Sequence, residues 1–165
     1  MLALLVILAL AAVSIASPLD KRQRPPGNPL YIRPVLAPAG QSMSLGVGRD
    51  NLHTVGMKYV NPSWLPPPSG WGQVKLWWSS GETGLDKCLD AGLTPGNGVR
   101  LKVWDCYDVP QQKWWIHDGQ IQLAGTNLCV DVTDGRVENA NVVQLWQCYD
   151  GNQNQQFRLT SSFTG

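Results

Sequence analysis

The sequence predicts an all-β protein assembled from internal repeats. Charged residues make up only 15% of the 165 residues, whereas glycine (17) and proline (12), which favour turns, are frequent. Short segments of alternating apolar and polar residues, such as 120–123 and 143–146, are separated by turns rich in Gly, Asn and Asp. Short strands at this spacing are typical of a β-barrel or β-sandwich rather than of alternating strands and helices.

The second half of the chain contains one pattern twice, in segments 88–114 and 129–157. Each segment has a cysteine followed two residues later by an aspartate, a tryptophan two residues before a second cysteine, and a closing aromatic residue. The first cysteine, the tryptophan and the closing aromatic residue recur after 41, 42 and 43 residues. A period of this size with recurring residue types predicts a repeat architecture.

Strand alternation separates the expected core from the expected site. Successive side chains of a strand point to opposite faces. If the aliphatic residues of 143–146 face the core, Gln144 and Trp146 share the other face. If the two valines of 129–132 face the core, Cys129 and Asp131 point outward.

The cysteines form two local pairs, Cys88 with Cys106 and Cys129 with Cys148. Each bridge would close a loop of about 20 residues, which stabilises a fold by ~3 kcal/mol in the chain-entropy model. If the paired cysteines lie directly opposite each other on antiparallel strands, the same register places Asp131 opposite Trp146. The upstream pair would likewise place Asp90 opposite Trp104.

A carboxylate beside an indole suits a sugar. The apolar C–H face of a sugar ring packs on an aromatic ring, and its hydroxyls donate hydrogen bonds to a carboxylate. The amides of Asn and Gln both donate and accept, so they can complete a polar rim.

Taken together, these residues resemble the ricin B-type lectin family over about residues 74–160. The family has a β-trefoil fold of three repeats, each ending in Gln-x-Trp, and the endings here are 112–114 and 155–157. The resemblance implies an all-β β-trefoil that binds galactose-type glycans. It implies a site in the third repeat formed by Asp131, Asp134, Gln144, Trp146, Asn154 and Gln155.

A second carbohydrate site is possible in the second repeat, from Asp90, Trp104, Gln111 and Gln112. Lys102 replaces the glutamine of the third repeat, and it can pair with Asp90 in competition with a sugar hydroxyl. Gln112 and Gln155 have an alternative role, because a Gln-x-Trp glutamine can hold its repeat together through backbone hydrogen bonds.

The first repeat is expected to be degenerate. Residues 39–73 contain no cysteine pair and no Gln-x-Trp. Residues 44–47 can correspond, in the first repeat, to residues 88–91 of the second. Trp71, which lies 43 residues before Trp114, is the expected closing aromatic. We expect the domain to span 31–162, with repeats at about 31–73, 74–117 and 118–160.

The N-terminus predicts secretion. An apolar run at 2–13 is followed by small residues at 14 and 16, which predicts a signal peptide over 1–16. Residues 17–30, with the dibasic Lys21 and Arg22, are expected to form a propeptide or extended tail. The apolar run is too short to span a bilayer. Secretion agrees with the even number of cysteines.

Other functions are disfavoured. A net charge of +1 gives no indication of nucleic-acid binding, and two histidines without Cys-x-x-Cys argue against a zinc site. No nucleophile motif indicates an enzyme, and we expect no cofactor. The alternatives that stay open are a β-trefoil protease inhibitor, which would act through a protruding loop, and a carbohydrate-binding accessory to a glycoside hydrolase.

Overall fold

The structure is a computed structural model that describes residues 28–39, 41, 43–48, 54–59, 64–77 and 86–161. The expected signal peptide and most of the expected tail lie outside these residues. The described part is all-β, as predicted, with three short 3-10 turns and no α-helix. The strands are β1 (Tyr31–Pro34), β2 (Met43–Val47), β3 (Val55–Tyr59), β4 (Trp64–Leu65), β5 (Trp71–Gly72), β6 (Lys75–Leu76), β7 (Lys87–Asp90), β8 (Lys102–Asp105), β9 (Trp114–His117), β10 (Gln120–Leu123), β11 (Leu128–Val132), β12 (Val143–Gln147) and β13 (Phe157–Thr160). The 3-10 turns are η1 (Pro110–Gln112), η2 (Thr133–Gly135) and η3 (Gln153–Gln155).

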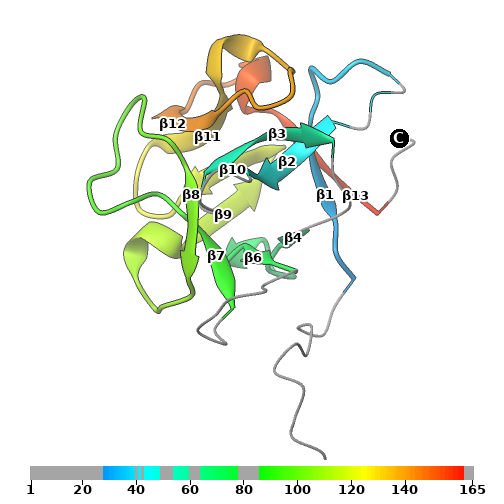
Figure 1. Ribbon diagram of the computed structural model, residues 1–165. Coiled ribbons are helices and arrows are strands. Elements are labelled where there is room, and N and C mark those ends of the chain that lie inside the picture. The colour runs from blue at the N-terminus through cyan, green and yellow to red at the C-terminus, as the bar shows by residue number, and fades with distance from the viewer. Residues whose placement is uncertain are drawn as a thin grey trace, which may run out of the picture.

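One four-strand arrangement occurs twice. The orders β4-β6-β7-β8 and β9-β10-β11-β12 have the same antiparallel pairing, one per repeat. Strand β1 pairs with β13, so the two ends of the described chain close on each other, and these strands lie side by side in Figure 1. The β2–β3 hairpin occupies the first repeat. Within the described residues, each repeat therefore contributes a corresponding hairpin, β2–β3, β7–β8 or β11–β12.

The inward side chains of all three repeats form a single core. Its fully buried members include Leu45, Leu89 and Val130 from the three repeats, packed with Trp64 and Trp114. The valines at 130, 132 and 143 and Leu145 are all buried, which confirms the predicted inward face of β11 and β12.

The closing aromatic of the first repeat is Trp64 rather than the expected Trp71. The Trp64 indole N–H donates to the Leu45 carbonyl over 2.9 Å, and the Trp114 indole N–H donates to the Leu89 carbonyl over 3.0 Å. These partners are 19 residues apart in the first repeat and 25 in the second. Because the first hairpin is shorter, a constant period of 43 residues selects the wrong tryptophan.

Trp71 belongs to an insertion between β4 and β6. The proline run at 66–68 ends β4 after two residues, since proline lacks the N–H that a strand ladder needs. The chain then turns at Gly70, where φ is +74° and a Cβ atom would lie 2.9 Å from the Ile116 carbonyl oxygen. Glycine at this position lets the short strand β5 pair with β9, which adds a fifth strand to the sheet of the third repeat.

Both predicted disulfides form, Cys88 with Cys106 and Cys129 with Cys148. The predicted strand register is wrong by two residues. Cys129 pairs with Trp146 and Asp131 pairs with Gln144, and in the second repeat Asp90 pairs with Lys102. The reason is that each second cysteine lies beyond the end of its strand, so the bridge runs diagonally rather than between directly opposed residues.

Replacement of Trp64 or Trp114 by phenylalanine tests the closing hydrogen bonds. Phe157 fills the corresponding place in the third repeat, so a benzyl ring is compatible with the fold. Each change leaves a buried carbonyl without its indole donor, and we expect the free energy of unfolding to fall by about 1–3 kcal/mol in urea denaturation. Trp71→Phe, at an exposed position, should change it by less than about 0.5 kcal/mol. Equal stability of all three variants would contradict this role.

Candidate functional site

Asp131 is the centre of the candidate site in the third repeat. It lies on β11, and only 4% of its surface is exposed. Gln144 on β12 donates its amide N–H to Asp131 Oδ1 over 3.2 Å. Gln155 on η3 donates to Asp131 Oδ2 over 3.2 Å. Both carboxylate oxygens are therefore held by amides.

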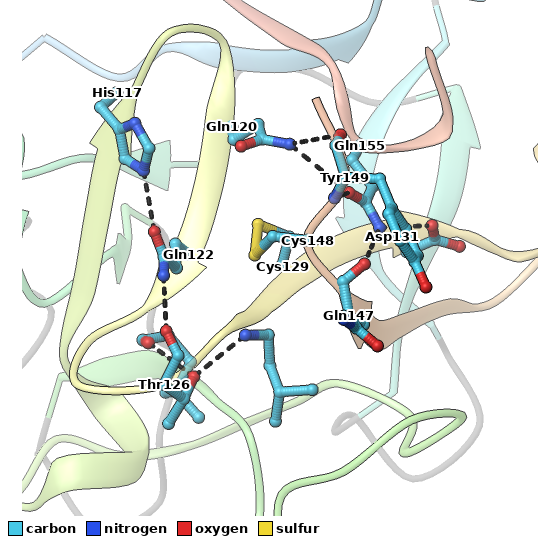
Figure 2. The surroundings of a disulfide bond; sticks show 12 residues. His117, Gln120, Gln122, Thr126, Cys129, Asp131, Gln147, Cys148, Tyr149 and Gln155 are labelled. Carbon is cyan, nitrogen blue, oxygen red and sulfur yellow. Dashed lines mark hydrogen bonds between the residues drawn. A yellow bond between two sulfur atoms is a disulfide. The ribbon is translucent and has the colours of Figure 1, made fainter. Parts of the chain in front are cut away.

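Gln155 is fully buried, so it acts on Asp131 rather than on a ligand (Figure 2). Its amide nitrogen also donates to the Gln147 carbonyl over 2.9 Å, and its Oε1 accepts from the Tyr149 N–H over 2.9 Å. Gln120 on β10 donates to the Tyr149 carbonyl over 3.1 Å. The glutamine of the Gln-x-Trp ending thus has the alternative, structural role rather than a place on the open face of the site, and it orients the carboxylate as well.

The second repeat contains the same network. Gln112 donates to Asp90 Oδ2 over 2.9 Å and to the Asp105 carbonyl over 2.8 Å, and it accepts from the Tyr107 N–H over 2.8 Å. Gln73 donates to the Tyr107 carbonyl, as Gln120 does to that of Tyr149. The buried amide and carboxylate are consequently part of the scaffold in both repeats.

Trp146 forms the exposed edge of the candidate site. It shares the outer face of β12 with Gln144 and is 39% exposed. A turn from the second repeat lies beside it, because a Cβ atom on Gly98 would lie 3.9 Å from Trp146 Cζ3. In the same turn, Asn97 Oδ1 accepts from the Gln147 N–H over 2.7 Å. Sequence reasoning missed this turn, since contacts between repeats leave no local pattern.

Asn154 and Asp134 lie on the two 3-10 turns beside Asp131. A Cβ atom on Gly135 would lie 2.7 Å from Asn154 Oδ1, so glycine is required where η2 meets η3. Asp134 is exposed, has a φ of 55°, and accepts from the Arg136 guanidinium over 3.2 Å. Its side chain is paired with arginine, whereas Asn154 lies half-buried at the junction of the turns.

The environment of Asp131 shifts its ionisation. Burial raises the pKa of the Asp131 carboxyl above its ordinary value, and the hydrogen bonds from Gln144 and Gln155 act in the opposite direction. The negative charge of Asp134 adds to the upward shift of the pKa of Asp131. The carboxylate therefore takes up a proton at a higher pH than an ordinary aspartate does.

In the second repeat a lysine occupies the corresponding position. Lys102 Nζ lies 4.0 Å from Asp90 Oδ1 and 4.7 Å from the centre of the Trp104 ring. The Gly92 N–H donates to the same Asp90 oxygen over 2.7 Å. The cation thus lies on the aromatic face and beside the carboxylate, the two groups that a sugar would need. Gln111, on η1, is half-buried and contributes its carbonyl to the Ala91 N–H.

The first repeat has glycine in place of the aspartate. Because Leu45 and Leu89 accept the equivalent indole hydrogen bonds, Gly46 corresponds to Asp90. Gly46 pairs with Gly56 across the β2–β3 hairpin, so neither strand supplies a polar side chain there.

The residues with described positions include no group of three or more His, Cys, Asp or Glu side chains arranged to bind a metal ion. Within the same residues, no helix has the length and apolar character needed to cross a membrane.

Solved structures with this fold include sugar-binding proteins. The C-half of an earthworm R-type lectin, in complex with GalNAc, has a TM-score of 0.60 at 16% identity and covers 82% of this chain and 100% of its own. The Macrolepiota procera ricin B-like lectin, in complex with lactose, has a TM-score of 0.62 at 20% identity, with 83% and 97% covered. The designed 3-fold symmetric protein ThreeFoil has a TM-score of 0.64 at 16% identity, with 81% and 99% covered. These similarities confirm the predicted β-trefoil.

A curated relative shares one short stretch with this chain. Beta-agarase AgaB34 of Agarivorans albus is 45% identical over 40 residues, which is 24% of this chain and 9% of the agarase. The similarity therefore covers only a small part of that enzyme.

The family itself follows from a longer match. Residues 73–162, more than half of the chain, match the ricin-type beta-trefoil lectin domain. The chain belongs to the family of ricin-type β-trefoil lectin domains.

Proposed function

We propose that this protein is a secreted lectin that binds galactose-type glycans at the third repeat. The observation that carries the proposal is the Asp131 carboxylate, held by two amides beside the exposed Trp146. The oriented carboxylate can accept hydrogen bonds from sugar hydroxyls, and the indole offers an apolar surface to the ring. GalNAc and lactose in the related lectin structures support a galactose-type ligand. The two disulfides support an extracellular environment.

The proposed roles differ among the site residues. Trp146 contacts the ring, Asp131 and Gln144 bind hydroxyls, and Asn154 adds an amide at the rim. Gln155 positions Asp131 from behind. A single open site buries little ligand surface, so we expect the affinity for simple galactosides to be in the high micromolar to millimolar range.

A second candidate function is that of a carbohydrate-binding accessory to a glycoside hydrolase. The short match to a protein named as a beta-agarase favours it. A hydrolysis assay on a chromogenic galactoside, with this protein alone, tests whether the chain itself has activity. We expect binding without hydrolysis.

The Asp131→Asn variant tests the carboxylate. The amide keeps the shape of the side chain but loses the charge-assisted hydrogen bonds to hydroxyls, each of which contributes roughly 1.5–3 kcal/mol. We expect galactoside affinity to fall at least about tenfold in titration calorimetry. Circular dichroism should show an unchanged fold. An unaltered affinity would show that the sugar binds elsewhere.

The two exposed tryptophans form a matched pair for a second test. Trp146 and Trp104 are similarly exposed, at 39% and 44%, and occupy equivalent strand positions. Trp146→Ala should abolish nearly all galactoside binding, because it removes the apolar platform. Trp104→Ala should leave most of it, because Lys102 already covers that ring. Calorimetry that found the greater loss in Trp104→Ala would assign the function to the second repeat.

Acidification should weaken galactoside binding. Hydroxyls donate to the ionised Asp131, so affinity falls as the carboxyl is protonated. Because the pKa of Asp131 is raised, the loss begins at a higher pH than for an ordinary aspartate, with a pKa of about 3.9. Calorimetry between pH 7 and 4 measures the fall in galactoside affinity. The Asp131→Asn variant binds more weakly throughout and should not show this pH-dependent fall. Equal wild-type affinity across this range would contradict the assignment.

The raised pKa of Asp131 affects folding stability in the opposite direction from sugar binding. A raised pKa means that the folded state favours the protonated carboxyl. The contribution of Asp131 to the free energy of unfolding is therefore fully present below its ordinary pKa and is lost as the pH rises through the raised value. Loss of binding at low pH would consequently not be caused by unfolding at Asp131.

A further inference from the structure

The candidate site lies at one end of a row of side chains that crosses the five-stranded sheet. The strand register pairs Trp146 with Cys129, Cys129 with Gln122, Gln122 with Trp115, and Trp115 with Trp71. Paired residues of antiparallel strands share one face of a sheet. The three tryptophans of the row therefore lie on the same outer face, on β12, β9 and β5.

All three indoles are accessible. Trp71 is 54% exposed and Trp115 is 48% exposed, in addition to Trp146. The neighbouring Trp114 is fully buried, which fixes the outward direction of Trp115 on β9. Exposed aromatic residues gathered on one face are typical of a binding surface.

Trp115 is held in a defined orientation. Its ring stacks on His117, with 3.7 Å between the ring centroids and 28° between the planes. His117 Nε2 lies 2.9 Å from Gln122 Oε1, so the imidazole is hydrogen-bonded to a side chain of the neighbouring strand β10 (Figure 2). A fixed aromatic ring loses little conformational freedom when a ligand binds.

A depression of about 350 Å³ lies beside Trp71. Its lining includes Lys113 and Asp108, whose ammonium and carboxylate groups are 2.5 Å apart. The hydrogen bond and the charge of Lys113 lower the pKa of the Asp108 carboxyl below its ordinary value. The Asp108 side chain is 91% exposed, so its second oxygen can accept from a sugar hydroxyl while Lys113 holds the first, unlike the buried Asp90 beside Lys102. The depression thus combines an indole with an accessible hydrogen-bond acceptor and a donor.

The β-trefoil scaffold itself does not require these aromatic residues. The equivalent row of the second repeat runs from Trp104 through Cys88 and Lys75 to Leu65. It has a lysine, salt-bridged to Asp86 over 3.0 Å, and a leucine where the third repeat has Gln122 and Trp115. Trp71 belongs to the β5 insertion. The aromatic row is therefore a property of one sheet rather than of the repeated fold.

We propose that Trp71, with Asp108 and Lys113, forms a second carbohydrate subsite, and that Trp115 connects it to the Trp146 site. The ligand is then a linear galactose-containing chain lying across the strands rather than a single terminal sugar. Neighbouring strands are about 4.8 Å apart, so Trp115 and Trp146 are separated by roughly 14 Å along the sheet. An oligosaccharide can span this distance, whereas a monosaccharide cannot. The inference rests on the proposed sugar site at Trp146.

A length series of galacto-oligosaccharides, from galactose to the hexasaccharide, tests the proposal by titration calorimetry. With the wild-type protein, affinity should rise with chain length. Trp71→Ala should lower hexasaccharide affinity about five- to tenfold and leave galactose affinity unchanged, because only the long ligand reaches the second subsite. Trp71→Phe, which keeps an aromatic ring, should retain most of the gain.

Two controls separate this inference from the proposed function. Trp104→Ala removes an equally exposed indole outside the row and should preserve the length dependence, while Trp146→Ala should remove binding of every ligand. Wild-type affinity that is the same for galactose and hexasaccharide, or a Trp71→Ala variant with unchanged hexasaccharide affinity, would overturn the second subsite and leave the Trp146 site intact. Absence of binding to any member of the series would overturn the proposed function and this inference together.

Discussion

A buried glutamine amide donates to a buried aspartate in two of the three repeats, and the candidate site depends on this contact. Gln155 and Gln112 each also bind backbone groups at the end of the second strand of the hairpin and just beyond it. A buried carboxylate without donors would be costly, since its charge has lost its hydration. The same amide therefore closes the repeat and makes a buried Asp131 or Asp90 tolerable. The stability of the repeat and the geometry of the candidate site are linked through one side chain.

The outer face distinguishes the repeats, while the inner network stays the same. In the third repeat Gln144 leaves the Trp146 ring open and supports the carboxylate with a neutral amide. In the second repeat Lys102 lies over the Trp104 ring and near the carboxylate of Asp90. One substitution on a strand thus changes a surface from open to occupied without disturbing the core. The repeats share a scaffold, and the local side chains give each of them a different outer surface.

The insertion before β6 extends this asymmetry. The prolines at 66–68 end β4 early, and the turn at Gly70 places β5 against β9. As a result the sheet of the third repeat gains a strand whose exposed residue, Trp71, continues the aromatic surface. The insertion that makes the first repeat hard to recognise in the sequence is thus the one that enlarges the sheet carrying the candidate site.

The sequence by itself determined the all-β class, the repeated pattern, both disulfides and the inward face of β11 and β12, because these follow from local spacing and alternation. Only the tertiary structure decided the strand register, which pairs Asp131 with Gln144 rather than with Trp146, since a disulfide can run diagonally. It also decided that Trp64 closes the first repeat, because loop lengths vary while core positions do not. The turn at Gly98 that lies beside Trp146 comes from another repeat, and packing between segments distant in the chain has no local signature.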